Sequence, residues 1–509
     1  MVRTVPVDGQ SLDLEGFLAI VRDGARVQLP PEARSRVEAS RRDVEGIVAR
    51  GAPVYGVTTG FGALSSQRID PSRARELQHG LIASHASGVG PALGEDVVRG
   101  MILLRANSLA RGQSGVRPEV IERLLDLLNH HLTPRVPERG SVGASGDLAP
   151  LAHLALALTG EGEFVGPDGR IEPAMAVLKR AGIPPLELRE KEGLGLVNGT
   201  GLMTSYLALG VDQSRALLEA GLIAAGITFD ALQGSPECFD DRLGEARNAP
   251  EERAISRSMR SLLADSELAI RRAEWIGQDP YTLRCIPQVL ATVGHALQAA
   301  RAVLDGELNA TTDNPLLLQG EFVNGGNFHG QSLAWAMDSL ALAIHTLGAF
   351  SERRISRLVH PALNRGLPAF LAPAGGLQSG FMIPQTVAAA LVNENATLAH
   401  PASAQSIPTS ADQEDFVSMG AWAGAKLHRI LGNARRIVAI EWIVAGQALE
   451  LRRPRQGGRG SEAALAALRS RVGPWTKDHS PSAEIELIAD AIGTGTLPDE
   501  VPFERAPRS

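Results

Sequence analysis

The chain has 509 residues, of which 44% are hydrophobic and 21% are charged, so it can bury a substantial core in one large or several ordinary domains. Its formal net charge of -7 at pH 7 argues against a general binder of nucleic acids. The two cysteines, Cys238 and Cys285, are too few for a disulfide framework and suit a reducing cytoplasm. Composition therefore favours a soluble globular protein and excludes a disordered one.

Neither a secretory signal nor a membrane span is expected. The first ten residues lack the apolar core of a signal peptide. The longest apolar runs are interrupted by Asp338 and Glu441, which shortens them below the length of a span. We expect a cytoplasmic protein.

The chain begins with two predicted amphipathic helices within residues 13–50, separated at Pro30 and Pro31. A loop rich in glycine and threonine follows at 55–62 and carries Tyr55. Its phenol is a candidate proton-transfer group, and a turn with an anchoring aromatic residue is the alternative.

A single histidine, His85, lies in the next segment, at 81–90. A lone histidine in such a setting is more often structural than functional. Helices are predicted over 97–109 and 120–131, and they lead into the central loop of the chain.

The central loop, Gly-Ser-Val-Gly-Ala-Ser-Gly-Asp-Leu-Ala-Pro, occupies residues 140–150 and consists mostly of glycine, alanine and serine. A loop with so few large side chains suits a place where backbone atoms approach each other or a ligand closely. Residues 151–158 predict a buried helix. Asp147 is expected to cap that helix, with Pro150 in its first turn.

The tripeptide Ala144-Ser145-Gly146 at the centre of this loop can close a ring on itself. Attack of the Gly146 nitrogen on the Ala144 carbonyl, followed by loss of water and of the Ser145 hydroxyl, leaves an imidazolone with an exocyclic methylene. A flexible turn is the alternative interpretation. A serine nucleophile elbow requires glycine where Asp147 lies, and the glycine spacing does not match a dinucleotide-binding loop.

The remainder of the chain is predicted to be overwhelmingly helical beyond the loops at 160–170 and 196–199. Apolar residues recur at heptad spacing on one face of one helix, as in a bundle: Ile430, Ile437, Val444 and Leu451. The expected fold is mainly α, a long central helical bundle with a loop-rich N-terminal domain. The domain boundary is placed near residue 200, which gives domains 1–200 and 201–509.

Residues 140–150 resemble the signature of the aromatic amino-acid ammonia-lyases, which form the electrophile 4-methylideneimidazol-5-one (MIO) from Ala-Ser-Gly. The similarity extends over nearly the whole chain and is strongest to the histidine branch. Further matching blocks lie at 55–62, 196–199, 278–284, 312–315, 325–329 and 413–415.

The resemblance implies an enzyme, a carbon–nitrogen lyase. It would remove ammonia from L-histidine to give trans-urocanate, the opening step of histidine degradation. The electrophile would be MIO made from Ala144, Ser145 and Gly146, with no diffusible cofactor and no metal. A tyrosine or phenylalanine ammonia-lyase and an MIO-dependent aminomutase remain alternatives.

The resemblance also assigns the catalytic and selective side chains. Tyr55 corresponds to the proton-abstracting base, and Tyr281 supports the same region. His85 falls where the family discriminates among substrate side chains, and Glu414 falls where histidine lyases bind the imidazole or assist proton transfer. Without the family, Glu414 would belong to a solvated acidic loop.

The remaining assignments concern binding and assembly. Asn198 and Gln278 correspond to amides that hold the ring and the substrate, and Phe328 to an aromatic residue that packs against them. Arg284 corresponds to the residue that grips the substrate carboxylate, although a surface salt bridge is the usual fate of an arginine. The expected partner is a second copy of the chain, in a homotetramer whose active sites are each shared by three chains, with neither nucleic acid nor membrane involved.

Two positions depart from the pattern of the histidine branch. Phe416 follows Glu414-Asp415 where histidine lyases commonly have histidine, and Thr58 occupies a position where they often have asparagine. Both departures concern the choice of substrate and leave the reaction class unchanged.

Overall fold

The computed structural model describes residues 4–270 and 277–505. The chain forms two compact units. The first unit comprises Met1–Leu209, Ala302–Met337 and Pro401–Ala425, and the second comprises Gly210–Arg301, Asp338–His400 and Lys426–Ser509. Both units are discontinuous in sequence, whereas the domains expected at 1–200 and 201–509 are continuous, and that boundary stays a prediction.

The first unit contains short helices, short strands and the loops between them. Its helices are α1 (Leu14–Val21), α2 (Pro31–Ala49), α3 (Ala74–His85), α4 (Glu95–Ala110), α5 (Pro118–Asn129), α6 (Leu148–Leu158), α7 (Ala174–Ala181) and α8 (Glu192–Val197), with single 3-10 turns at Gly62–Leu64, Pro71–Arg73 and Ala402–Ala404. Its strands are β1 (Thr4–Pro6), β2 (Arg26–Gln28), β3 (Val89–Ala92), β4 (Thr133–Pro134), β5 (Pro137–Arg139), β6 (Glu163–Val165), β7 (Ile171–Pro173), β8 (Leu316–Leu318) and β9 (Glu321–Val323).

The strands form only small sheets. β1 and β2 pair in parallel, β3 pairs with β5, β6 lies between β4 and β7, and β8 pairs with β9, the last four pairings all being antiparallel. The helices predicted over 97–109 and 120–131 are α4 and α5. The first predicted helix is shorter than expected, because α1 ends at Val21 and the chain continues into β2.

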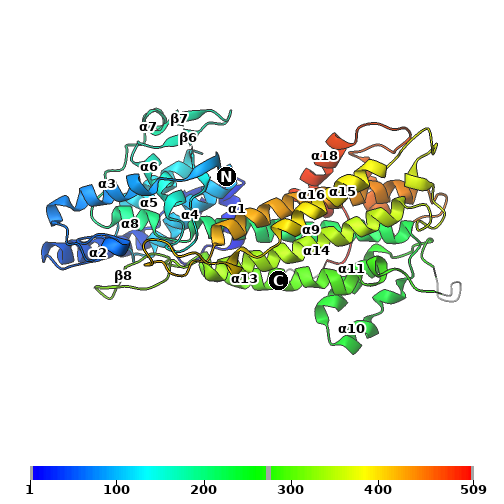
Figure 1. Ribbon diagram of the computed structural model, residues 1–509, viewed down its shortest axis with the longest axis horizontal. Coiled ribbons are helices and arrows are strands. Elements are labelled where there is room, and N and C mark those ends of the chain that lie inside the picture. Colours follow the sequence, from blue (N-terminus) through cyan, green and yellow to red (C-terminus); the bar gives the residue numbers. More distant parts are fainter. Residues whose placement is uncertain (1–3, 271–276, 506–509) are drawn as a thin grey trace. The chain divides into compact units, whose positions relative to one another are not determined.

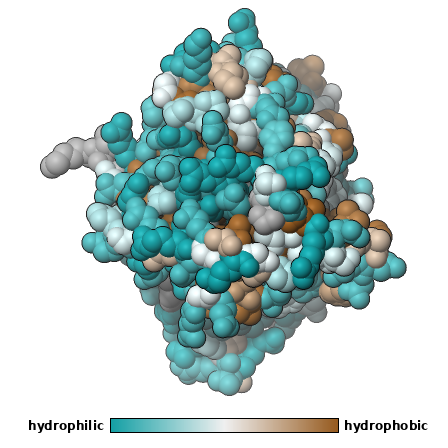
Figure 2. Space-filling view, turned by 90° about the vertical axis from the view of Figure 1, so that its left-hand side faces the viewer, coloured by the Kyte–Doolittle hydropathy of each residue, from teal (hydrophilic) through white to brown (hydrophobic). Residues whose placement is uncertain are grey.

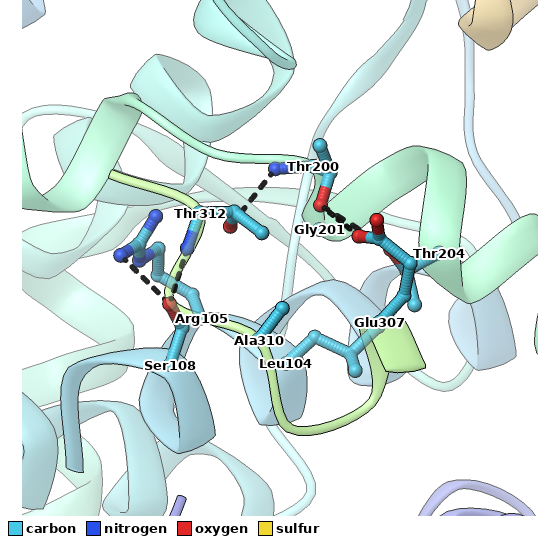
Figure 3. Close-up of a pocket in the computed structure, with 9 residues that line it drawn as sticks. All are labelled: Leu104, Arg105, Ser108, Thr200, Gly201, Thr204, Glu307, Ala310 and Thr312. Carbon is cyan, nitrogen blue, oxygen red and sulfur yellow. Dashed lines mark hydrogen bonds between the residues drawn. The ribbon is translucent and has the colours of Figure 1, made fainter. Parts of the chain in front are cut away.

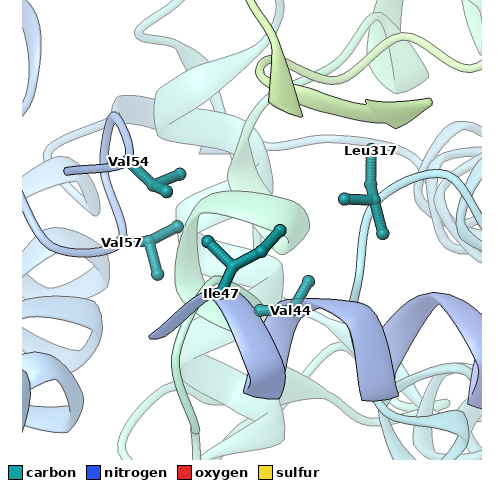
Figure 4. Close-up of a cluster of buried hydrophobic side chains, with 5 residues drawn as sticks. All are labelled: Val44, Ile47, Val54, Val57 and Leu317. Carbon is teal, nitrogen blue, oxygen red and sulfur yellow. The ribbon is translucent and has the colours of Figure 1, made fainter. Parts of the chain in front are cut away.

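The loop that carries Tyr55 is anchored by a buried apolar cluster (Figure 4). The cluster consists of Val44 and Ile47 from α2, Val54 and Val57 from the loop, and Leu317 from β8. Because Val54 and Val57 flank Tyr55, their burial fixes the backbone on both sides of the phenol.

The second unit is built from long helices, several of which continue into the first. Figure 1 shows α9 (Gly201–Ala231), α13 (Ile286–Glu307), α14 (Gln331–Val359), α15 (Met382–Leu398) and α16 (Gly420–Glu450) running alongside one another. The shorter helices are α10 (Asp241–Arg247), α11 (Pro250–Leu262), α12 (Tyr281–Arg284), α17 (Arg459–Arg469), α18 (Ser482–Gly493) and α19 (Thr496–Asp499), with 3-10 turns at Pro236–Phe239 and Ala369–Leu371. The prediction of a mainly α fold is confirmed.

The apolar stripe predicted on the last long helix lies in the core. Ile430, Ile437 and Val444 of α16 are all fully buried, and Leu451 lies just beyond the end of the helix with 38% of its surface exposed. Alternating turns of α16 therefore pack against the bundle as the heptad spacing predicts.

A buried carboxylate connects three of these helices within the second unit. Glu441 of α16 accepts hydrogen bonds from Thr228 of α9 (2.8 Å), from Ser351 of α14 (2.5 Å) and from Arg354 of α14 (2.5 and 2.7 Å). The side chains of Arg354 and Glu441 are both 0% exposed. The charge that interrupts the apolar run at Glu441 is therefore paired inside the bundle.

Removing one partner of this ion pair is expected to be costly. Arg354→Met should lower the free energy of unfolding by about 3 to 5 kcal/mol, because Glu441 would keep a buried charge with only two hydroxyl partners. Arg436 of the same α16 pairs with Glu486 at half-exposed positions, so Arg436→Met should cost less than about 1 kcal/mol. Denaturant unfolding of both variants measures the difference, and equal losses would contradict the expectation.

One described helix, α14, is long and apolar enough by length and composition to cross a membrane. Core helices of soluble proteins pass the same test, and 56% of its most apolar window is buried. Within the second unit, Asp338 of α14 accepts a hydrogen bond from Lys426 of α16 at 3.0 Å, and both side chains are nearly fully buried. A buried ion pair on α14 fits a core helix better than a lipid-exposed one.

The face of the molecule in Figure 2 is mostly hydrophilic, with apolar side chains in small separate groups. Scattered apolar side chains of this kind are normal on a soluble protein.

Candidate active site

The central loop is in close backbone contact with the loop before α9. Gly146 and Gly199 form an isolated parallel bridge, and the Asp147 N–H donates to the Gly199 carbonyl at 2.7 Å. Gly146 has a φ of +73°, and a Cβ at this position would lie 2.2 Å from the Gly199 oxygen. Both the conformation and the space therefore require glycine at 146.

The other end of the loop is held by the segments that precede α14 and α16. The Gly143 carbonyl accepts hydrogen bonds from Ser418 Oγ (3.0 Å) and from the Gly330 N–H (3.3 Å), and the Met419 N–H donates to the Val142 carbonyl (2.8 Å). Ala144 is buried, with 4% of its surface exposed. The tripeptide 144–146 is thus fixed on both sides by segments distant in sequence.

The predicted capping role of Asp147 is wrong. Asp147 occupies the N-cap position of α6 but makes no side-chain bond to that helix. Its carboxylate instead accepts from the backbone N–H groups of Leu202 (2.9 Å) and Met203 (3.1 Å) in the first turn of α9, and from Ser141 Oγ (3.0 Å). With φ −100° and ψ 56°, the residue lies outside the extended conformation that lets a side chain fold back onto its own helix.

Asp147 is fully buried, and its environment changes its ionisation. Burial raises the pKa of the Asp147 carboxyl to about 7, although the hydrogen bonds from Met203, Ser141 and Leu202 oppose this by favouring the charged form. A carboxyl whose pKa is higher in the folded than in the unfolded chain stabilises the fold fully only below its ordinary pKa. That contribution is lost as the pH rises towards 7.

We therefore expect Asp147→Asn to change the pH dependence of stability. Between about pH 5 and pH 8 the free energy of unfolding of the unsubstituted chain should fall by about 2 to 3 kcal/mol relative to the variant. Denaturant unfolding of both chains across this range measures the difference. Parallel pH profiles would contradict the raised pKa.

Ser145 contacts two of the predicted site residues. Its Oγ donates to Glu414 Oε1 at 2.5 Å, across 269 residues of sequence, and its carbonyl oxygen accepts from Asn198 Nδ2 at 3.0 Å. The second carboxylate oxygen of Glu414 accepts from Thr409 Oγ1 at 2.7 Å, and the backbones of these two residues bond to each other. The structure thus brings Ser145, Asn198 and Glu414 together, and Thr409 orients the carboxylate.

His85, the last residue of α3, lies near this carboxylate. Burial lowers the pKa of the His85 imidazole, and the negative charge of Glu414 partly opposes the shift. Ser84 Oγ lies 3.0 Å from His85 Nδ1. The lowered pKa favours a neutral imidazole, which can both donate and accept a hydrogen bond.

Tyr55 lies in a loop that approaches the segment of Glu414. Its hydroxyl oxygen accepts from the Gly62 N–H at 3.0 Å, and its ring packs edge-on against Phe61. A Cβ at Gly62 would lie 2.9 Å from Ser410 Oγ, so the Tyr55 loop and the loop 409–414 are in contact. The phenol retains its own O–H for donation to another group.

Phe328 is partly buried in the loop before α14. The next residue, His329, lies with its Nε2 3.2 Å from the Phe416 carbonyl oxygen, and the two rings stack at 6.2 Å. Since the Gly330 N–H donates to Gly143, the loop that carries Phe328 is attached directly to the central loop. Phe416, which departs from the pattern of the histidine branch, therefore contacts the loop that carries Phe328, and it does so through His329.

Gln278, Tyr281 and Arg284 belong to the second unit. Gln278 is exposed, and 68% of the surface of Tyr281 is exposed. The Arg284 guanidinium lies 4.5 Å from the centre of the Tyr281 ring and donates from Nε to the Asp279 carbonyl at 2.9 Å. The carboxylate of the neighbouring Asp279 pairs with Arg365 at 2.7 Å, and the role of Arg284 stays a prediction.

Two residues of the first unit that sequence reasoning did not single out contact the candidate site. Thr409 bonds Glu414, and the buried Arg105 of α4 donates to the Asn198 carbonyl at 2.5 Å. Neither has a local sequence signal, because each acts through a partner far away in the chain. The described part of the chain contains no group of three or more His, Cys, Asp or Glu side chains arranged to hold a metal ion.

Comparison with known proteins connects this geometry to a family. The family model for aromatic amino acid lyases matches residues 12–470. The chain is 48% identical to the histidine ammonia-lyase of Symbiobacterium thermophilum over 491 residues, covering 96% of both chains. It is 49% identical to the histidine ammonia-lyase of Deinococcus radiodurans over 492 residues, covering 96% of this chain and 93% of the relative.

Solved structures agree. A tyrosine aminomutase from Streptomyces globisporus superposes with a TM-score of 0.93 at 38% identity, with 98% of each chain covered. A histidine ammonia-lyase from Trypanosoma cruzi superposes with a TM-score of 0.90 at 37% identity, covering 98% of this chain and 96% of that one. With the family model matching most of its length and relatives nearly half identical to it, this chain belongs to the aromatic amino acid lyase family.

Proposed function

We propose that this chain is a histidine ammonia-lyase, which eliminates ammonia from L-histidine and releases trans-urocanate. The curated relatives with 43% to 49% identity over nearly the whole chain carry that name. The observation that carries the proposal most directly is the contact of Glu414 with Ser145, because it places a carboxylate at the residue expected to become electrophilic.

The electrophile is proposed to be MIO, made by the chain itself from Ala144, Ser145 and Gly146. The residues fit this group, because position 146 accommodates only glycine and the tripeptide is fixed at both ends. MIO supplies an electrophilic carbon that makes the substrate amino group a better leaving group. Asn198 holds the carbonyl oxygen at 145 by a hydrogen bond, which favours negative charge on that oxygen.

The proposed proton transfers use Tyr55 and Glu414. The Tyr55 oxygen accepts from the Gly62 N–H, and this bond orients the hydroxyl that is proposed to abstract a weakly acidic β-hydrogen. Glu414 accepts a hydrogen bond from the Ser145 hydroxyl, and a second hydrogen bond from Thr409 holds its carboxylate there. It is positioned to accept the N–H of a substrate imidazole or to exchange a proton with it.

Substrate choice is proposed to depend on His85 and Glu414 together. A neutral His85 and a charged Glu414 offer complementary donors and acceptors to the two imidazole nitrogens. A hydroxyphenyl or phenyl ring would leave part of these groups without partners, which is costly in a buried site. Phe416 stacks on His329 and leaves both His85 and Glu414 in place, so it does not remove this pair of polar groups.

Recognition of the amino acid's carboxylate is assigned to Arg284, with Tyr281 and Gln278 as its neighbours in sequence. The support is that Arg284 bonds the Asp279 backbone carbonyl through Nε alone, while the Asp279 carboxylate pairs with Arg365. The other N–H groups of a guanidinium suit a bidentate bond to a carboxylate. We propose that these residues enter active sites shared between chains of a homotetramer. Apolar side chains exposed on α15, including Met382, Ile383 and Val387, suit a face that another copy covers.

A cytoplasmic location is also proposed. The two cysteines are free thiols, as expected in a reducing compartment.

A substrate panel tests the function. Purified enzyme incubated separately with L-histidine, L-tyrosine and L-phenylalanine should release ammonia and an ultraviolet-absorbing unsaturated acid from L-histidine alone. If only L-tyrosine or L-phenylalanine is converted, the proposed specificity for L-histidine is rejected, but the proposed reaction, elimination of ammonia, is retained. Because a tyrosine aminomutase superposes closely, the products are also analysed for β-amino acids. Their appearance would show that the enzyme is an aminomutase and not a lyase.

A further inference from the structure

Arg105 contacts Asn198 and Gly199, the two residues that form hydrogen bonds to the central loop. It is on α4 and is only 2% exposed. Its Nη1 donates to the Asn198 carbonyl at 2.5 Å, and the Asn198 side chain donates to the Ser145 carbonyl at 3.0 Å. Two hydrogen bonds therefore connect the guanidinium to the peptide at position 145.

The contact is close enough to constrain the neighbouring backbone. A Cβ at Gly199 would lie 2.2 Å from Arg105 Nη1, so the guanidinium occupies the space that a side chain at 199 would need. The Gly199 carbonyl, in turn, accepts the Asp147 N–H of the central loop. Arg105 thus packs against the same two residues, 198 and 199, that bond the loop.

Arg105 also lines a small cavity of about 10 Å³, together with Thr200, Glu307 and Thr312. Figure 3 shows these side chains around it. A cavity of that size holds at most about one water molecule. Thr200 bonds Glu307 at 3.1 Å and Thr312 at 3.3 Å, so these polar groups are largely occupied with one another. With only 2% of its surface exposed, Arg105 has little contact with bulk water.

No anionic side chain among the described residues bonds directly to the positive charge of Arg105. Within the described residues no carboxylate oxygen lies within ion-pair distance of it, and its Nε has no hydrogen-bond partner. The negative charge of Asp313 acts on Arg105 from a distance, but the Asp313 carboxylate is bonded to the buried Lys191 at 2.8 Å. A buried cation without a paired anion is unfavourable unless a negative charge arises near it.

Another arginine of α4 provides the contrast. Arg99 is also 2% exposed, but its guanidinium bonds three backbone carbonyls, of Ile20, Val21 and Leu128. These carbonyls lie at the ends of α1 and α5, where the helix dipoles are negative. Arg99 is therefore compensated by the resting fold, whereas Arg105 donates to one carbonyl and, at 3.4 Å, to the hydroxyl of Ser108.

We propose that Arg105 is a positioning residue for the elimination reaction. It holds Asn198 against the carbonyl at position 145 and supplies the positive charge that balances negative charge developing there during turnover. A fixed charge that is shielded from bulk solvent acts strongly and needs no reorganisation when the reaction occurs. This inference rests on the proposed function and adds a group that does not touch the substrate.

The test compares Arg105→Gln and Arg105→Lys with the matched variant Arg99→Gln. For each, kcat and KM are measured with L-histidine, and the intact mass is compared with that calculated from the sequence. Arg105→Gln should lack the mass of two water molecules like the unsubstituted enzyme, lose kcat by about 10- to 100-fold and keep KM within about twofold. Arg105→Lys should recover part of kcat, and Arg99→Gln should lose stability but keep kcat.

Three results would overturn the proposal: an unchanged kcat in Arg105→Gln, an equal loss in Arg99→Gln, or a folded Arg105→Gln chain that retains both waters. If Arg105→Gln does not fold, Arg105→Lys decides, since its kcat must fall at least about threefold with KM unchanged. If the unsubstituted enzyme converts L-tyrosine or L-phenylalanine instead of L-histidine, the proposed specificity fails, and the ratios between variants on that substrate still judge Arg105. An enzyme inactive on all three overturns both proposals.

Discussion

Replacing Ser145 by alanine is expected to abolish nearly all lyase activity, with kcat falling by at least about 1000-fold. The hydroxyl of Ser145 is the group that ring formation must eliminate, so alanine leaves an ordinary peptide at this position. Elimination would then require a poor leaving group and a barely acidic β-hydrogen to react without an electrophile. Absorbance of the unsaturated product, followed with L-histidine as substrate, measures the loss.

A buried serine elsewhere in the same unit provides the control. Ser205 of α9 is fully buried, and its hydroxyl donates to the Val97 carbonyl of α4 at 2.9 Å and not to a residue of the central loop. Ser205→Ala should keep kcat, so that loss of a buried hydroxyl alone does not explain the effect. Substantial turnover by Ser145→Ala would contradict the proposed electrophile.

The second large effect is expected from Glu414→Gln. The amide keeps the shape and still accepts the Ser145 hydroxyl, so the loss of two waters should proceed. It can neither carry the negative charge nor take up a proton, and kcat should fall by about 100- to 10,000-fold. Stopped assays at matched pH, combined with intact-mass measurement, separate this loss of turnover from a failure to form the electrophile.

The neighbouring carboxylate is the matched control for this variant. Asp415 is exposed, and Asp415→Asn changes the same charge at the adjacent position. It should lower kcat by less than about twofold, because exposed charges act weakly through water. Equal effects of the two substitutions would reduce the role of Glu414 to that of a general surface charge.

The helical part of the fold follows from patterns that the sequence displays locally. The helices predicted over 97–109 and 120–131 differ from α4 and α5 by only one or two residues at each end. Periodicity succeeds here because each helix buries a continuous face. The discontinuous composition of the two compact units has no such local signal, since it depends on where residues 302–337 and 401–425 return to the first unit.

The close backbone packing of the central loop could also be predicted from its residue types, because glycine at 146 matches a conformation with positive φ. The helix that the Asp147 side chain binds could not be predicted. From the sequence, Asp147 is expected to cap α6, the helix that follows it directly. In the folded chain its carboxylate instead accepts hydrogen bonds from the first turn of α9. The contact between Ser145 and Glu414 likewise joins residues too far apart for any motif to connect.

Arg105 illustrates the limit most clearly. In the sequence it is one of two arginines on a helix, and nothing distinguishes it from Arg99. In the structure both are equally buried, and only their hydrogen-bond partners separate the compensated charge from the one directed at Asn198. Long-range contacts of this kind are consequences of packing that composition and periodicity do not encode.

The most direct test of the self-made electrophile is the mass of the peptide that contains residues 144–146, isolated from enzyme that converts L-histidine. The expected mass is lower than that calculated from the sequence by two water molecules, and the same peptide from Ser145→Ala should have its full calculated mass. A full-mass peptide from active enzyme would contradict the proposal that Ala144, Ser145 and Gly146 form the reactive group.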